Sequence, residues 1–204
     1  MAAMPDPVPD QVPDRVPDPV SGPVLETARL ILRRIEPGDA ERQYRLLNTP
    51  AMMDHLGGPK SLDQIRERLD KSQRLFAERG FGFLFLVEKA SGEMVGHCGI
   101  KLVDNLLAHN LGDLEVGWAV REDRWRRGYA YEAMRAVLNW AFAVHGAPHV
   151  VALTATRNEA SWRLMEKLGM RRAPELDFDD PAYPPQDNPT ILYRILRSAW
   201  EAGR

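Results

Sequence analysis

Glu115 is an acidic residue whose sequence surroundings favour a chemical role. In "DLEVGWAV" (113–120), apolar residues alternate with Glu115, Gly117 and Ala119. Alternate residues of a β-strand share a face, so this carboxyl group would lie beside two very small residues, and such a face leaves room for a ligand. A carboxylate there can act as a general base. The alternative is a structural pairing of Glu115 with a nearby arginine.

A basic turn follows this strand. The segment "REDRWRRGYAYEA" contains Arg124, Arg126 and Arg127, and a long helix is predicted to begin after Gly128. Free N–H groups at a helix start favour an anion, and glycine lets the anion approach the backbone. The turn therefore predicts a phosphate site, with a solvated arginine-rich turn as the alternative. It matches neither the P-loop pattern G-x-x-x-x-G-K-[ST] nor the dinucleotide pattern G-x-G-x-x-G.

A third segment, Asn158-x-x-Ser161, opens the helix predicted after the buried strand "HVVALTA" (149–155). An asparagine at this place is typical of an N-cap, whose side chain bonds the first turn of the helix. The serine is compatible with an ordinary place on the helix surface. Gly169 is the expected end of the helix, as a left-handed stop.

These segments belong to an alternation of strands and helices that predicts an α+β domain. The connection between residues 81–88 and 94–103 is too short for a parallel crossover, so these strands form an antiparallel hairpin. Ser61 and Gln64 have the spacing of a capping box and predict a helix start. Strands are expected at 28–35, 81–88, 94–103, 113–120, 149–155 and 190–196, and helices at 37–48 and after Ser61, Gly128 and Asn158.

Composition limits the classes of protein that need to be considered. The 204 residues are 44% hydrophobic and 27% charged, which is a globular composition. No apolar run approaches the roughly 18 to 20 residues that span a bilayer, and the start lacks a secretory signal, so a cytoplasmic protein without a membrane partner is expected. A single cysteine and dispersed histidines exclude an internal disulfide and a closed zinc site, and no metal is expected.

Repeated Val-Pro-Asp units fill the first part of the chain. Prolines throughout residues 1–23 oppose both helix and sheet, so this segment is predicted to be a disordered, polyproline-like tail. It is interpreted as a solubilising leader, with a docking peptide as the alternative. Residues 24–204 are then expected to form a single domain.

In this order, the motifs resemble the acyl-CoA-binding core of the GNAT superfamily of N-acetyltransferases. The Trp-x-x-Gly-Tyr-Ala form at 125–130, the Asn158-x-x-Ser161 pair and "MEKLGM" carry the resemblance, which covers roughly residues 25–197. The first two most resemble the branch that includes the Rim-type ribosomal-protein N-terminal acetyltransferases. The resemblance implies a mostly antiparallel sheet of about seven strands flanked by helices and splayed between strands 4 and 5. Many family members dimerise, so a homodimer is also implied.

The resemblance also implies acetyl-CoA as the acyl donor. Amides of the turn would bind the pyrophosphate, Asn158 would bind the pantetheine arm, and an N–H near Trp118 or Ala119 would polarise the thioester carbonyl. The family often has Gln or Arg at the position of Trp125, which is alternatively a packing residue. The implied cofactor-binding residues are Trp118, Ala119, Val120, Arg126, Arg127, Gly128, Tyr129, Ala130 and Asn158.

Two catalytic roles carry over from the same resemblance. Glu115 would remove the amine proton through water, and Ser161 would supply a proton to the leaving CoA thiolate. Many members use a tyrosine four residues beyond this serine, where the present chain has Met165. His55 lies in a region that lines the acceptor pocket in the branch. An acidic loop over residues 174–187 carries charges that can attract a cationic acceptor, or it is a plain solvated loop.

The expected activity is transfer of an acetyl group from acetyl-CoA to a primary amine by direct attack in a ternary complex. The acceptor is a small-molecule amine or a protein N-terminus. Two alternatives remain from other classes. Met165 in place of the common tyrosine is compatible with a module that binds acyl-CoA without turnover. The cluster Arg124–Arg127 is compatible with an RNA-associated protein, although the net charge of −2 disfavours nucleic acid as a partner.

Overall fold

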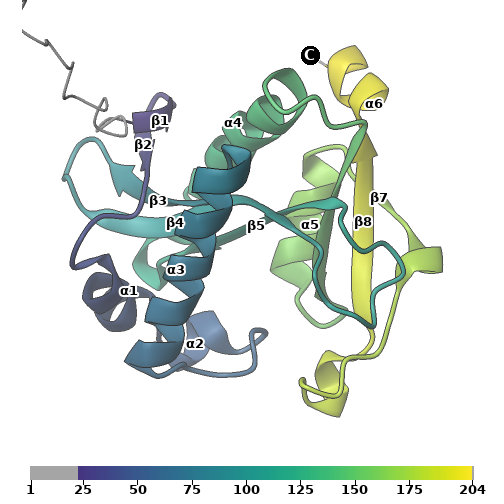
Figure 1. Cartoon of the computed structure of the whole chain (residues 1–204), viewed down its shortest axis with the longest axis horizontal. Coiled ribbons are helices and arrows are strands. Elements are labelled where there is room, and N and C mark those ends of the chain that lie inside the picture. The colour runs from purple at the N-terminus through teal and green to yellow at the C-terminus, as the bar shows by residue number, and fades with distance from the viewer. Residues whose placement is uncertain (1–22, 204) are drawn as a thin grey trace, which may run out of the picture.

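An eight-stranded sheet is the framework of the described part of the chain, residues 23–203 of this computed structural model (Figure 1). The strand order is β1-β2-β3-β4-β5-β6-β8-β7, and neighbours are antiparallel except β5 and β6. The strands are β1 (Pro23–Glu26), β2 (Leu30–Arg33), β3 (Phe83–Glu88), β4 (Met94–Leu102), β5 (Leu114–Val120), β6 (His149–Ala155), β7 (Arg171–Arg172) and β8 (Thr190–Leu196).

The expected strands are all present, and β6 and β8 have the expected bounds. Two further strands raise the total above the seven that the resemblance implied. β1 follows the proline-rich segment and β7 has only two residues, so neither shows a period-two pattern in the sequence. The tail expected at residues 1–23 lies outside the described residues, apart from Pro23, which opens β1.

Helices cover both faces of the sheet. Figure 1 shows α3 in front of the central strands and α4 behind them. Ser61 and Gln64 form the expected capping box at the start of α3. No helix within residues 23–203 is long and apolar enough to cross a membrane. The helices are α1 (Asp39–Leu47), α2 (Pro50–Met53), α3 (Leu62–Arg79), α4 (Tyr129–Ala143), α5 (Glu159–Lys167) and α6 (Arg197–Ala202).

The main core lies between the sheet and α4. Met134, Val137 and Leu138 of this helix are fully buried in the same cluster as Ile100 and Val116 of β4 and β5. Met165 and Leu168 belong to this cluster as well, so α5 packs on the same side as α4. A smaller cluster, in which the loops at 103–113 and 174–189 pack on β6 and β8, consists of Val103, Ala108, Val151, Phe178 and Leu192.

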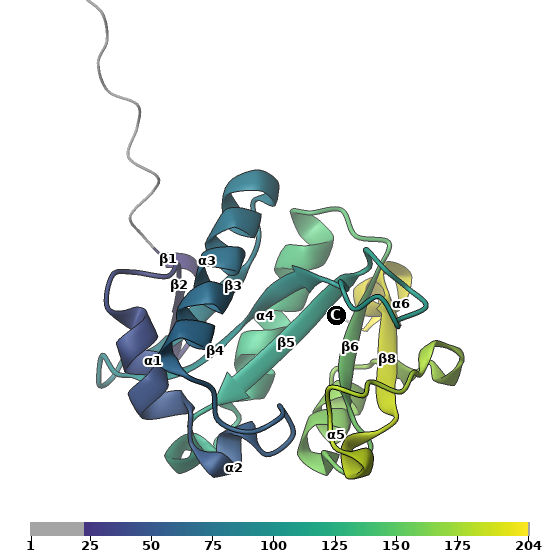
Figure 2. The same cartoon turned by 60° about the horizontal axis from the view of Figure 1, so that its bottom comes forward.

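The sheet is split at its centre. β5 and β6 are parallel and pair only at Glu115 and Val151, near the start of each strand, and they diverge toward their carboxyl ends (Figure 2). These strands are the fourth and fifth of the expected series, so the expected splay is confirmed. By contrast, β4 and β5 pair along the whole length of β5, and β6 and β8 along the whole length of β6.

Candidate functional site

The carboxyl ends of β5 and β6 lie at one edge of the sheet, where the two strands have separated (Figure 2). Residues 121–128 lead from β5 into α4, and residues 156–158 lead from β6 into α5. Both helices therefore begin at this edge, where their free N–H groups and dipoles favour negative charge. Open sheets with parallel strands bind ligands outside such carboxyl ends. This edge is the candidate site.

The splay leaves part of the β5 backbone without a neighbouring strand. The Arg121 N–H donates to the Val95 carbonyl on the β4 side at 2.8 Å. Backbone groups alternate sides along a strand, so those of Ala119 also face β4, whereas those of Trp118 and Val120 face β6. The pairing with β6 ends at Glu115 and does not reach Trp118. Of the two N–H groups considered from the sequence, that of Trp118 points into the split.

The turn before α4 has the backbone conformation that an anion site needs. Arg126 and Gly128 have positive φ angles of 59° and 80°, and Gly128 caps α4 without a side-chain bond. The first intrahelical bond runs from the Glu132 N–H to the Gly128 carbonyl. The N–H groups of Tyr129 and Ala130 precede this bond and stay outside the helical ladder. These amides are therefore available for phosphate oxygens.

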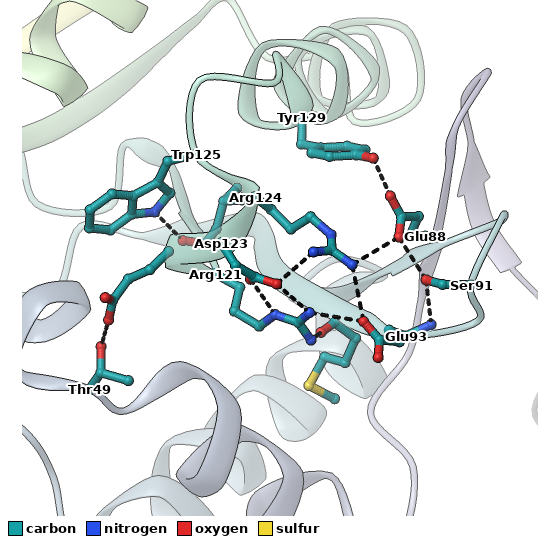
Figure 3. A network of polar contacts seen from close by, with 12 residues as sticks. Thr49, Glu88, Ser91, Glu93, Arg121, Asp123, Arg124, Trp125 and Tyr129 are labelled. Carbon is teal, nitrogen blue, oxygen red and sulfur yellow. Dashed lines mark hydrogen bonds and ion pairs between the residues drawn. The ribbon is translucent and has the colours of Figure 1, made fainter.

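A buried ion network ties this turn to the β3–β4 hairpin (Figure 3). The Tyr129 hydroxyl donates to Glu88, Ser91 donates to the same carboxylate at 2.7 Å, and Arg124 lies 3.4 Å from it. These contacts, with that of Tyr129 the largest, lower the pKa of Glu88 to about 2, so the carboxylate stays ionised at neutral pH. Arg124 also pairs with Glu93 at 3.1 Å. Arg124 is therefore part of the scaffold, and its charge is not free for a ligand.

Two further contacts fix the shape of the turn. Arg29, between β1 and β2, donates to the Arg127 carbonyl at 2.9 Å and pairs with Glu132 at 2.6 Å. The Trp125 indole N–H donates to the Val120 carbonyl at 2.5 Å. Arg29 was not predicted, because it lies far from the turn in the sequence and no nearby pattern marks it. Its partner Glu132 could have been found, because an acidic residue is favourable in the first turn of a helix.

Arg126 and Arg127 differ from Arg124. Both side chains are exposed, and neither has an ion-pair partner within residues 23–203. They leave unpaired positive charge beside the turn.

Glu115 lies where β5 and β6 still pair, and it is only 8% exposed. Its carboxylate is 3.0 Å from the Lys101 ammonium on β4. Burial raises the pKa of Glu115, and Lys101 opposes part of this rise. The ion pair considered from the sequence thus exists, but its cation is a lysine. The space beside Gly117 is smaller than expected, because the Phe83 ring lies 3.0 Å from where a Cβ would be.

Asn158 and Ser161 lie together at the start of α5. The Asn158 side chain accepts a bond from the Ser161 N–H at 3.3 Å, so the predicted N-cap is present. The Ser161 side chain is half-buried in the first turn of the helix. Met165, one turn further, is 1% exposed and belongs to the core.

On the other side of this edge, around Asp54, Arg157 and Asp187, the charges are largely paired with one another. Arg157, just beyond β6, lies 2.8 Å from Asp54 after α2 and 2.5 Å from the buried Asp187. His55 lies 3.5 Å from the same Asp187. Arg157 was not predicted as a site residue. The only indication in the sequence was the presence of acidic residues, such as Asp54 and Asp187, that need a cationic partner. The contact from Asp54 to Arg157 joins segments that follow opposite halves of the split sheet.

Most of the acidic loop is neutralised as well. Asp177 pairs with Arg172, and Glu175 pairs with Arg194 at 3.1 Å. Asp180 is buried and accepts a bond from Asn105, whereas Asp179 is exposed. The structure therefore favours a structural role for this loop over the attraction of a cation. Residues 23–203 contain no group of three His, Cys, Asp or Glu side chains placed to hold a metal ion.

Comparison with known proteins agrees with this architecture. The N-acetyltransferase YnaD of Bacillus subtilis, itself uncharacterized, is 36% identical over 72% of this chain and 82% of its own length. The crystal structure of an acetyltransferase from Agrobacterium tumefaciens matches with a TM-score of 0.71 and 27% identity over 89% of this chain and 98% of that chain.

A further solved structure shares the fold at lower identity. Spermidine N-acetyltransferase of Vibrio cholerae, crystallised with CoA and spermine, has a TM-score of 0.67 and 15% identity over 85% of this chain and 98% of that chain. The sequence model of the acetyltransferase (GNAT) domain matches residues 29–171. Together with the split sheet and the free amides at its open edge, this match shows that the chain belongs to the GNAT family of acetyltransferases.

Proposed function

We propose that this acetyltransferase transfers an acetyl group from acetyl-CoA to a primary amine by direct attack within a ternary complex. The observation that carries the proposal is the split between β5 and β6, with the starts of α4 and α5 at its open edge. An extended acyl donor can enter such a split while its phosphates bind at a helix start. Both requirements are met by adjacent segments of one chain.

The donor would be held mainly by backbone. The amides of Gly128, Tyr129 and Ala130 would bind the pyrophosphate, and the exposed Arg126 and Arg127 would add attraction at longer range. Asn158 would bind the pantetheine arm with its side-chain amide while it caps α5. The Tyr129 ring is buried and its hydroxyl is bonded to Glu88, so only its backbone is offered to the ligand.

The chemistry requires a neutral amine and a stabilised oxyanion. Glu115, with its raised pKa, would accept the ammonium proton through water, and the free amine would attack the thioester carbonyl. The Trp118 N–H would bond the carbonyl oxygen as it becomes negative. The nitrogen then loses its second proton and the carbon–sulfur bond breaks. Ser161, at the α5 start, would give its hydroxyl proton to the thiolate and regain a proton from the nitrogen, so the serine ends neutral and the products are the amide and the CoA thiol.

The acceptor is proposed as a small-molecule primary amine or a protein N-terminus. The Vibrio cholerae enzyme with the same fold acts on spermidine, which supports a polyamine as one probe. The Trp125 to Ala130 form and the Asn158–Ser161 pair support the finer proposal of a Rim-type acceptor, a protein N-terminus. Peptides with free N-termini are therefore the second probe.

Two measurements test the proposal in sequence. Acetyl-CoA at about a hundred times its Kd should add roughly 2.7 kcal/mol of stability and raise the Tm, whereas ATP and NAD should not. Release of CoA thiol should then occur with at least one amine from a panel of polyamines, aminoglycosides and peptides. If acetyl-CoA raises the Tm but no amine causes thiol release, the protein binds the donor without turnover. If acetyl-CoA does not raise the Tm of the folded protein, the proposed donor site is wrong.

A further inference from the structure

A cavity of about 170 Å³ lies between α4, α5 and α6. Its lining includes two aromatic side chains, Tyr131 from α4 and Trp200 from α6, and two cations, Arg135 from α4 and Lys167 from α5. No acidic side chain lines it. Both cations are exposed, so the cavity is accessible from the surface. An aromatic hollow flanked by free cations favours a ligand that is both apolar and acidic.

The two cations are held in place without being neutralised. The Lys167 ammonium lies 4.6 Å from the centre of the Tyr131 ring, and the Arg135 guanidinium lies 5.7 Å from that of Trp200. The Trp200 ring is fixed in turn, because its indole N–H donates to the Asn139 side chain at 3.0 Å. Within residues 23–203, neither cation pairs with a carboxylate. Cation–π contacts orient such groups and preserve their charge for an anion.

The chain contains a sequence with the chemistry that this cavity favours. Val-Pro-Asp occurs at 8–10, 12–14 and 16–18, in a stretch that lies outside the described residues and is called here the Val-Pro-Asp segment (residues 8–18). Each unit places two apolar residues directly before a carboxylate. Residues 1–22 contain four aspartates and one arginine, so their net charge is opposite in sign to that of the cavity. Proline-rich sequences of this kind are bound by aromatic-lined grooves.

This segment is connected to the described part of the chain close to α4. Thr27, just after β1, donates to Glu132 at 2.6 Å, and Glu132 is the neighbour of Tyr131 in α4. Pro23 lies about 13 Å from Thr27 along the extended strand. Figure 1 shows α4 between β1 and α6, and a helix is about 10 to 12 Å wide. Nine residues separate Asp14 from Pro23 and can span about 28 Å, which is enough for this path.

We propose that the cavity is a docking site for the Val-Pro-Asp segment of the same chain. A valine or proline of one unit would pack against the Tyr131 and Trp200 rings, and the aspartate that follows would pair with Arg135 or Lys167. The three units offer three alternative registers for the same contacts. A short tether supplies an effective concentration in the millimolar range, so weak contacts suffice. The inference does not depend on the proposed acetyl transfer.

A labelled peptide of residues 8–19 tests the site by fluorescence anisotropy on the full-length chain. A fourfold variant removes the acids of the chain's own segment, so its cavity should be free and should bind the peptide. The wild type should bind the peptide about tenfold more weakly, because a tether at roughly 1 mM effective concentration competes when the Kd is about 0.1 mM. The fourfold variant carries Asp6→Asn, Asp10→Asn, Asp14→Asn and Asp18→Asn.

Changes at the cavity itself supply the second half of this test. Adding Arg135→Gln/Lys167→Gln to the fourfold variant should abolish peptide binding. Adding Lys71→Gln/Arg163→Gln instead removes the same charge from exposed ion pairs elsewhere and should leave peptide binding intact. An unchanged Tm in both variants would show that neither pair of substitutions disturbs the fold.

Carbodiimide coupling locates the segment in the wild type, because it joins a lysine directly to a carboxylate that lies in contact with it. Mass spectrometry should find an amide between Lys167 and an aspartate of the Val-Pro-Asp segment within one chain. This product should be absent from Lys167→Gln.

Each other result overturns the proposal in a distinguishable way. Equal peptide affinity in the wild type and the fourfold variant would show that the segment does not occupy the cavity. Peptide binding that survives Arg135→Gln/Lys167→Gln would place the site elsewhere. Coupling products that join only two different chains would replace docking within one chain by an interface between copies. A folded fourfold variant that does not bind the peptide would remove the docking site altogether.

Discussion

The proposed donor side and the proposed acceptor side of the split sheet use charge in opposite ways. On the donor side, the basic turn keeps Arg126 and Arg127 unpaired within residues 23–203, and the amides before α4 stay outside the helical ladder. On the acceptor side, Arg157 lies between Asp54 and Asp187. Charges on the donor side are therefore available to a ligand, whereas those on the acceptor side are largely taken up by the fold.

This difference shows that charged residues in one motif can have two roles, a structural role in an ion pair or a free charge available to a ligand. Arg124 and Arg126 lie only two positions apart in the sequence, yet the first is paired with Glu88 and Glu93 and the second is exposed. An ion pair that is part of a scaffold positions backbone, and its loss acts through geometry. An exposed cation acts at a distance and is screened by salt. The predictions below follow this distinction, from the largest expected effect to the smallest.

Replacing Gly128 should have the largest effect. Gly128→Asp puts a carboxylate at the start of α4 and forces a side chain onto a φ of 80°, so CoA affinity should fall by at least about 100-fold. Gly38→Asp is the matched control, because Gly38 also caps a helix with a φ of 86° and has open space around it. Calorimetry should show unchanged CoA binding in this control. An equal loss in both variants would mean that backbone strain alone explains the effect.

Glu115→Gln should lower kcat by about 100-fold and leave the Kd for CoA unchanged, if Glu115 is the base. Wild-type kcat should fall as the pH falls through the raised pKa of Glu115, because the protonated carboxyl cannot accept a proton. Lys101→Met removes the cation that lowers this pKa, so the acid limb should move to higher pH. Identical pH–rate profiles for wild type and Glu115→Gln would assign proton removal to another group.

Arg157→Gln tests the acceptor side. Asp187 would lose its main partner while staying buried, so the Tm should fall and the KM for the amine should rise several-fold, with CoA affinity unchanged. Arg163→Gln is the control, because Arg163 makes an exposed pair with Glu159 on α5 and should change neither quantity. A loss of CoA affinity in Arg157→Gln would show that the two sides are not separate.

Arg126→Gln/Arg127→Gln should give the smallest effect. CoA affinity should fall by about threefold in low salt, and the difference should vanish near 1 M salt, because both side chains are exposed. The Tm without ligand should not change, since no ion pair within residues 23–203 is lost. A fall in Tm would mean that these arginines support the turn, as Arg124 does.

The sequence predicted the elements around the donor site because their signals are local. The alternation in β5, the glycine before α4 and the asparagine before α5 each lie within a few residues of the feature that they specify. The structure confirms the predicted bounds of β6 and the predicted N-cap at Asn158. Backbone sites at helix starts depend on nearest neighbours, so a single sequence is enough to locate them.

What the sequence could not predict depends on contacts between distant segments. The partner of Glu115 proved to be Lys101 on the neighbouring strand, and no pattern near either residue specifies their register. The same holds for Glu88 beneath the turn and for Arg157 between two loops. The acidic loop showed that a run of charge predicts nothing about exposure until the partners that neutralise it are known.

The single bridge between Glu115 and Val151 has a consequence for solubility. A strand with unpaired N–H and C=O groups normally attracts another chain, and proteins usually shorten, charge or cover such an edge. Here β5 and β6 each present an edge to the inside of the split, with β4 and β8 on their outer sides. The unpaired groups of these two edges therefore face each other across the split, so another chain could pair with them only by entering it.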